Sequence, residues 1–353
     1  MIRRNLITRL SLAAVTLLTA PAAFAQDIHF TQFDLAPMTV NPAFTGVFDG
    51  RIRVSAIYRN QWASVTVPYV TYGAAVDLPL LLENNDDRLS AGLQLFKDQA
   101  GDGNLSNFTG LVSIAYHKSI KSNNLRRDAS SELSVGLQGG YAQKSIDLSK
   151  LYFGDEFLNG AFVPATSQEY HLGLGNSVNY YLVNAGIAFS HGGEKFGYTL
   201  GVAANNLNQP NDDIEKKQNS QTGLDMRYTG ELGINWVVGQ RLTLRPAVLY
   251  QNQATASELI AGNEFLYQVG GNPGYSDFST AVFLGGWYRT GDATMITAGV
   301  EFKGFRIGVA YDYNVSTLNA SSNGNGGFEI GIRYTAPNAS KFAGRRTIPC
   351  SRF

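Results

Sequence analysis

Hydrophobic side chains alternate with polar or small ones along much of this chain. In FRIGVAYDYN (305–314), every odd-numbered residue is aromatic or aliphatic and every even-numbered residue is polar or small. FEIGIRY (328–334) repeats this alternation, with Glu329, Gly331 and Arg333 on its other face. Successive side chains of a β-strand point to opposite faces, so each segment predicts a strand with one apolar face and one polar face.

About fourteen such segments follow one another, and each is close to the ten or so residues that a tilted strand needs to cross a membrane. Turn-forming residues separate them, and no helical pattern of useful length intervenes. Strands joined in this way run antiparallel to their neighbours. The segments begin near residues 51, 69, 88, 105, 131, 180, 195, 223, 241, 257, 277, 292, 305 and 325.

A barrel explains this pattern better than a soluble sandwich, because the run of strands is long and no linker rich in Pro or Ser divides it. The chain has 38 glycines, and its mean hydropathy of −0.12 is ordinary for a barrel with one polar and one apolar face. We predict an all-β antiparallel transmembrane barrel of the outer membrane, with about 14 strands over residues 51–336. A soluble β-protein is the alternative. Several aromatic residues near strand ends are typical of membrane-interface girdles: Tyr58, Trp62, Tyr116, Trp236, Tyr250 and Tyr288.

The first 25 residues have the pattern of a signal peptide. Three arginines precede an apolar run from Leu10 to Leu18, which is too short to span a bilayer. A small-x-small site then predicts cleavage between Ala25 and Gln26. The exported chain would lose three of its 28 basic residues and keep 28 acidic ones, so its charge would be 25 − 28 = −3. This balance gives no electrostatic case for binding nucleic acid.

Residues 26–50 form an arm ahead of the first strand. LAPMTVNPAFTGVFDG (35–50) contains two prolines and two glycines, so it is neither a regular helix nor a ladder strand. We expect this arm on the periplasmic side, folded into the barrel mouth as a plug, because it has too many apolar residues for a disordered segment. A disordered arm that orders on a periplasmic partner is the alternative. The plug prediction singles out Phe30, Phe33 and Phe44 as buried side chains, with Asn41 and Pro42 making the turn.

No motif predicts a catalytic, cofactor-binding or metal site. Cys350 is the single cysteine, and no nucleophile elbow is present. KDQAGDGN (97–104) offers carboxylate and amide oxygens that suit calcium, from Asp98, Asp102 and Asn104. Asp-Gly steps are more often hairpin turns, however, and we favour a turn here. Four histidines occur, none of them in a zinc-enzyme frame: His29, His117, His171 and His191.

Two long motifs lie near the two ends of the chain that follows the signal peptide, QDIHFTQFDLAPMTVNPAFTG (26–46) and YDYNVSTLNASSNGNGGFEIGIRY (311–334). Together with shorter motifs between them, they resemble the PorP/SprF family of the Bacteroidota type IX secretion system. The tail, 337–353, ends in IPCSRF, with Ser351 where the family often has proline, so the role of this tail stays open. The intervening matches are YRNQW (58–62), PYVTYGAAVD (68–77), DQAGDGNLS (98–106), SIAYHKSI (113–120), KSIDLSKLYFGDEF (144–157), GVAANNLNQPN (201–211) and YRTGDA (288–293).

The resemblance implies an outer-membrane component of the secretion and gliding apparatus. Such a protein would assist the export or surface anchoring of a large secreted partner, often an adhesin with a C-terminal sorting domain. Outer-membrane lipid and periplasmic subunits of the machine are the other implied partners. A passive channel for small solutes is the alternative function. We expect inward faces rich in Gly, Ser and Ala with few charges, which argues against an open channel.

Overall fold

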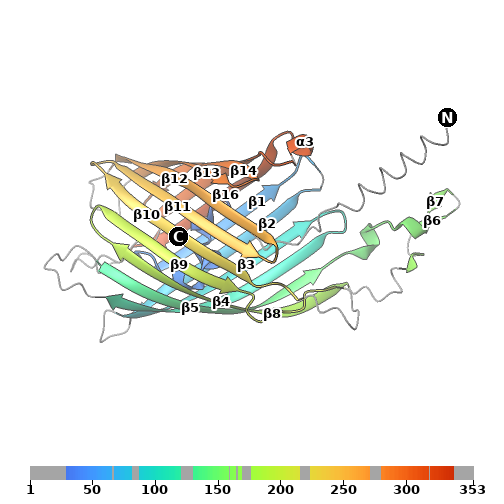
Figure 1. The fold of residues 1–353 in the computed structure, drawn as a ribbon, viewed down its shortest axis with the longest axis horizontal. Coiled ribbons are helices and arrows are strands. Elements are labelled where there is room, and N and C mark those ends of the chain that lie inside the picture. The colour runs from blue at the N-terminus through green and yellow to red at the C-terminus, as the bar shows by residue number, and fades with distance from the viewer. Residues whose placement is uncertain are drawn as a thin grey trace.

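The computed structural model describes residues 29–65, 67–81, 87–120, 130–158, 160–163, 166–168, 176–214, 223–270, 280–317 and 319–337. Within these residues, fourteen strands form one closed barrel in which neighbours run antiparallel (Figure 1). The barrel closes through pairing of its first and last strands, from Ile52–Ala336 to Gln61–Gly327. This result confirms the predicted antiparallel barrel.

The barrel strands are β1 (Ile52–Gln61), β2 (Tyr69–Leu81), β3 (Arg88–Ala100), β4 (Leu105–Ile120), β5 (Ser130–Ser145), β8 (Ser177–Gly192), β9 (Phe196–Asn205), β10 (Arg227–Val238), β11 (Leu242–Gln253), β12 (Ala256–Gly270), β13 (Thr280–Arg289), β14 (Ala293–Phe302), β15 (Phe305–Asn314) and β16 (Asn325–Ala336). Predicted and observed strand starts agree within a few residues. The largest differences are at β8, β10 and β13, where turn residues near the strand ends blur the alternation.

The period-two pattern sorts side chains between the two faces of the barrel wall. In β4, Val112 and Ile114 expose 56% and 55% of their surface, whereas Ser113 between them is fully buried. Exposed apolar side chains of this kind form the lipid-facing band of a membrane barrel. Four of the predicted girdle aromatics, Tyr116, Trp236, Tyr250 and Tyr288, are also exposed. No helix among the described residues is long and apolar enough to cross a membrane.

The two ends of the barrel differ. We call the end where β1 begins and β16 ends the proximal end; the tight turns 193–195, 239–241 and 303–304 lie there. The opposite, distal end carries the long β5–β8 connection (146–176) and β9–β10 connection (206–226). The distal end lies at the right of Figure 1, where α3 (Asn319–Ser322) and the short pair β6 (Phe157–Leu158) and β7 (Ala161–Phe162) extend past the wall.

Candidate functional site: the arm-filled lumen

Residues 30–48 of the arm are almost entirely buried inside the barrel. They fold into three short helical turns, η1 (Phe33–Leu35), α2 (Pro37–Val40) and η2 (Pro42–Phe44). Turns rather than a regular helix form because the prolines lack a backbone donor. Phe30, Phe33 and Phe44 expose 3%, 4% and 0% of their surface.

Phe33 packs edge-on against Trp287 of β13, with ring centroids 5.3 Å apart. Phe30 lies 6.0 Å from the ring of Phe96 on β3. The aromatic side chains of the arm therefore contact opposite stretches of the barrel wall. At these positions, arm side chains fill the lumen.

At the distal end, the arm joins a buried cluster of charges. The guanidinium of Arg59 pairs with Glu329, and its Nη2 lies 3.0 Å from Asp312 Oδ2. The backbone amides of Thr31 and Gln32 donate to the two oxygens of Glu329, at 2.6 and 2.9 Å. The Thr31 hydroxyl also donates to Asp312 at 2.7 Å. Both carboxylates are thus shared between a barrel arginine and the arm.

A second buried cluster lies closer to the proximal end. The carboxylate of Asp34 in the arm forms an ion pair with Arg306, with Oδ2 3.0 Å from Nε. Arg306 also pairs with Glu264 on β12, at 2.7 Å, and with Glu301 on β14. Its guanidinium stacks over the ring of Phe283, 3.8 Å from the centroid. One arm carboxylate therefore completes a network that links three strands.

Asn41 holds the middle of the arm. Its Nδ2 donates to Glu231 Oε1 at 2.6 Å and lies 3.2 Å from the carbonyls of Ile187 and Val202. Its Oδ1 accepts the amide of Ala43 at 2.9 Å, which is the N-cap bond of η2. The Asn41 side chain thus both forms the turn and ties it to the wall.

The last part of the arm is fixed at the proximal end. The amide of Gly46 donates to Asp77 Oδ2 at 2.6 Å. Arg53 pairs with the same carboxylate at 2.7 Å and donates to the Phe44 carbonyl at 3.2 Å. His117 Nε2 lies 2.9 Å from the Thr45 carbonyl, so β4 also contacts the arm.

Inward-facing glycines make room for the arm. A Cβ on Gly136 of β5 would overlap the backbone of Pro42 and Ala43, and one on Gly186 of β8 would overlap the Asn41 side chain. Gly331 on β16 meets Leu35 in the same way. The small residues on the inward faces of these strands therefore leave space that the arm occupies.

We expect Gly136→Val to lower the unfolding free energy by about 1–3 kcal/mol, because the added side chain forces the arm backbone to move. Urea unfolding in lipid vesicles measures this change. Gly286→Val is the matched control, since Gly286 also lies within a strand but a Cβ there meets no atom within 4 Å. An equal loss in both variants would contradict the steric explanation.

The expectation of an inward face with few charges is wrong. Most strands carry one or two buried charged side chains, and many of these pair with a charge on a nearby strand or with the arm. Each strand contributes only one or two of them among small residues, so the local sequence understates the total. The buried charged residues of the barrel strands are Arg53, Arg59, Asp77, Arg88, Glu132, Arg227, Glu231, Glu264, Arg289, Arg306, Asp312 and Glu329.

Asp87 is a titratable group outside the spanning strands, beside the proximal start of β3. Its carboxylate accepts hydrogen bonds from Lys118 Nζ and Tyr116 Oη, both at 2.7 Å, and from the Ser119 amide at 3.0 Å. These bonds, that from Lys118 first, lower the pKa of Asp87 to about 2. The charged carboxylate therefore ties the β2–β3 connection to the end of β4.

The other sequence candidates lie apart from the arm. Residues 101–104 form a hairpin turn, with Gly101 and Asn104 at positive φ and the Asn104 amide bonded to the Gly101 carbonyl at 3.1 Å. Asp98 accepts the Thr71 hydroxyl. Among the described residues, no group of three or more His, Cys, Asp or Glu could hold a metal ion. Ala25, Gln26, His171 and Cys350 lie outside the described residues.

Sequence reasoning missed a small folded unit within the β5–β8 connection. Tyr152, Phe157 and Phe162 expose 71%, 55% and 50% of their surface. The ring of Phe162 lies 5.4 Å from that of Tyr152 and 5.1 Å from that of Phe157, and we call these three rings the aromatic platform. Glu156 supports it, because its carboxylate accepts the Phe153 amide at 3.0 Å and its carbonyl accepts the Val163 amide at 2.8 Å.

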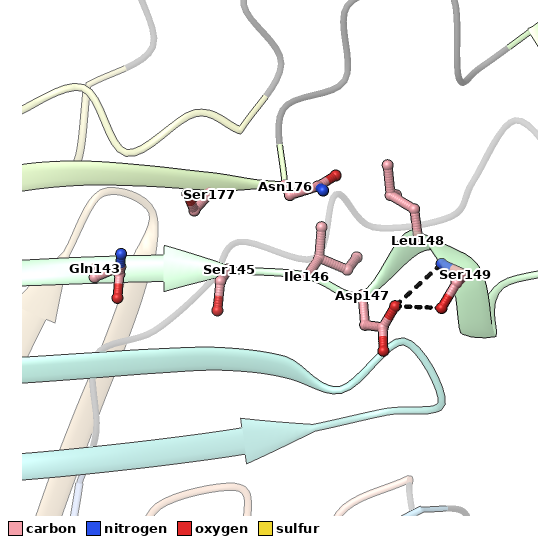
Figure 2. A pocket seen from close by; sticks show the side chains of 8 residues that line it. All are labelled: Gln143, Ser145, Ile146, Asp147, Leu148, Ser149, Asn176 and Ser177. Carbon is pink, nitrogen blue, oxygen red and sulfur yellow. Dashed lines mark hydrogen bonds between the residues drawn. The ribbon is translucent and has the colours of Figure 1, made fainter.

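A groove of about 610 Å³ lies beside the base of this unit, where β5 ends and β8 begins (Figure 2). Asp147 is the only charged group among its described lining residues, and its carboxylate is already bonded to the amide and hydroxyl of Ser149. The remaining lining is neutral, so the groove shows no site built for a particular ligand. Its other lining residues are Gln143, Ser145, Ile146, Leu148, Asn176 and Ser177.

Comparison with solved structures finds many membrane barrels of low identity. The toluene transporter TbuX of Ralstonia pickettii is 10% identical, with a TM-score of 0.45 over 85% of this chain and 93% of that one. CdiB from Escherichia coli is 9% identical, with a TM-score of 0.45 over 80% of this chain and 63% of that one. A deletion mutant of the monoaromatic hydrocarbon channel TodX is 11% identical, with a TM-score of 0.45 over 86% and 94%.

The family comparison is more specific. No curated protein sequence matches the chain. The sequence profile of the family described as type IX secretion system membrane protein PorP/SprF matches residues 22–334. Because this match covers nearly the whole chain and agrees with the resemblance of its motifs, the protein belongs to the PorP/SprF family of type IX secretion system membrane proteins.

Proposed function

We propose that this outer-membrane barrel assists the export or surface anchoring of a large secreted partner, in type IX secretion and gliding. The partner would be an adhesin-like protein or another protein with a C-terminal sorting domain, and periplasmic subunits of the machine would bind the opposite rim. The chain would reach the membrane after signal-peptide cleavage between Ala25 and Gln26. The barrel would act as an anchor, without catalysis.

The observation that supports an anchor is the filled lumen. Hydrogen bonds and ion pairs hold the arm at the distal end through Glu329, in the middle through Glu231 and at the proximal end through Asp77. The cavity beside His29 and Glu258 measures only about 20 Å³, which is room for about one water molecule. A passive channel would need an open bore, and this arm fills much of it.

Binding would then use the rims. Outer-membrane barrels have short periplasmic turns and longer extracellular loops. Both of the longest connections, 146–176 and 206–226, are distal, which supports placing the distal end at the cell exterior. The aromatic platform lies on the longest distal connection and holds three exposed rings on a folded support. Aromatic side chains are enriched among the residues that dominate protein–protein binding. We therefore assign the partner contact to this platform.

A pull-down of the tagged protein from detergent-solubilised outer membranes, followed by mass spectrometry, tests this proposal. We expect a large exported protein or secretion-machine subunits in the eluate. Replacing Tyr152, Phe157 and Phe162 with Ser should reduce recovery of the exported partner by about tenfold or more, because each truncation removes a desolvated contact. Val315→Ser, at another exposed distal position, is the control. A pure barrel without companions would contradict the anchor role.

A further inference from the structure

The arm runs along the barrel axis from one end to the other. Thr31 binds Asp312 and Glu329, which lie near the distal ends of β15 and β16. Gly46 binds Asp77 near the proximal end of β2, and the Arg51 amide donates to the Ala336 carbonyl at the end of β16. The arm therefore does more than close the proximal mouth, where the sequence places it.

This direction fixes where the chain upstream of the arm must go. His29 lies beside Arg227 and Glu258, both at distal strand ends, and lines the small cavity there. Only residues 26–28 separate it from the expected cleavage site, and three residues reach at most about 10 Å. Returning to the proximal end would require a second pass through a lumen that the arm already occupies.

We propose that the arm is threaded through the barrel, so that the N-terminus of the exported chain emerges at the distal, cell-surface mouth. The C-terminal tail leaves β16 at the proximal end, on the other side of the membrane. Two consequences follow. The barrel wall must close around the arm during folding, because β1 is paired with β16 along its full length. The distal mouth also gains an N-terminal peptide that the proximal rim lacks.

Epitope accessibility in intact cells tests this topology. A short epitope inserted between Asp27 and Ile28 reports the N-terminus. The same epitope inserted after Gly160, in the β6–β7 turn, marks the distal end, and one inserted after Gly239, in the β10–β11 turn, marks the proximal end. We expect the N-terminal epitope to bind antibody in intact cells, as the Gly160 epitope does, whereas the Gly239 epitope binds only after permeabilisation. An N-terminal epitope that behaves like the Gly239 epitope overturns the proposal.

A single cysteine substitution repeats the test without an inserted epitope, which could itself keep the arm from entering the barrel. Asp27→Cys in a Cys350→Ser background adds one thiol, and the unaltered chain carries only Cys350. A membrane-impermeant maleimide should label Asp27→Cys in intact cells and Cys350 only after permeabilisation. Labelling of both thiols from the same side would show that the arm is not threaded. This readout needs no partner, so its outcome is separate from that of the pull-down.

Discussion

Deletion of residues 29–48 should turn a closed barrel into a conducting one. In planar bilayers we expect the ion conductance of the intact protein to stay near that of the bare bilayer. The deletion variant should conduct about tenfold more than the intact protein, or better. The physical reason is that barrels of this size enclose more space than their own side chains fill. Without the arm, paired charges such as Arg59 and Glu329 would face water, which supports ion passage.

Two further variants make this result interpretable. Gly136→Val keeps the full chain but displaces the arm where it crosses β5, and should produce intermediate or intermittent conductance. Gly286→Val should behave like the intact protein, since that position meets no arm atom. Retained strand content by circular dichroism excludes a misfolded pore. Large, steady conductance in the intact protein would contradict the anchor proposal and support the passive channel.

The barrel itself was predictable because its signal is local. The alternation in β15 and β16 assigns each side chain to one face of the wall, and the turn residues between strands mark the connections. These features need no knowledge of distant residues. The assignment of Phe283 and Trp287 to a buried inner face is less obvious, because the apolar face of most strands points outwards. The arm supplies an apolar partner for Trp287 through Phe33, and the ring of Phe283 lies under the Arg306 guanidinium.

The contents of the lumen were not predictable in the same way. Thr31 and Asp312 are separated by 281 positions, and nothing near either one indicates the other. Glycine on an inward face reads as a small lining residue, yet Gly136 is needed because Pro42 and Ala43 lie against it. Likewise, a single Arg or Glu in a strand gives no indication that it has a charged partner on another strand. Only the closed topology gathers these charges into networks.

These networks give the lumen the character of a polar protein core. A buried charge is tolerated when hydrogen bonds and an opposite charge compensate the loss of water. The arm supplies part of that compensation through backbone amides at Glu329 and Asp77, and through the Asp34 carboxylate at Arg306. The arm and the wall therefore form one folding unit, in which loss of either side leaves unpaired charge on the other.

Substitution of Arg59 should show most clearly that the arm and the barrel wall depend on each other for charge compensation. We expect Arg59→Met to lower the unfolding free energy by about 3–5 kcal/mol, because Glu329 and Asp312 would remain buried without their shared cation. Urea unfolding in lipid vesicles gives the value, and bilayer conductance reports whether the distal part of the arm has come loose. Lys150→Met, at an ion pair with Asp147 in which both side chains are exposed, should change stability little.

The double variant Arg59→Met, Glu329→Gln separates charge from shape. Glutamine keeps one oxygen to accept from one of the Thr31 and Gln32 amides, which now bond to different oxygens of Glu329, and it removes the buried charge that Arg59 balanced. We therefore expect it to recover about half or more of the stability lost in Arg59→Met, because neutralising both partners of a buried pair costs less than removing one. Additive losses in the double variant would mean that packing around the Arg59 side chain, and not charge balance, holds the arm at the distal end.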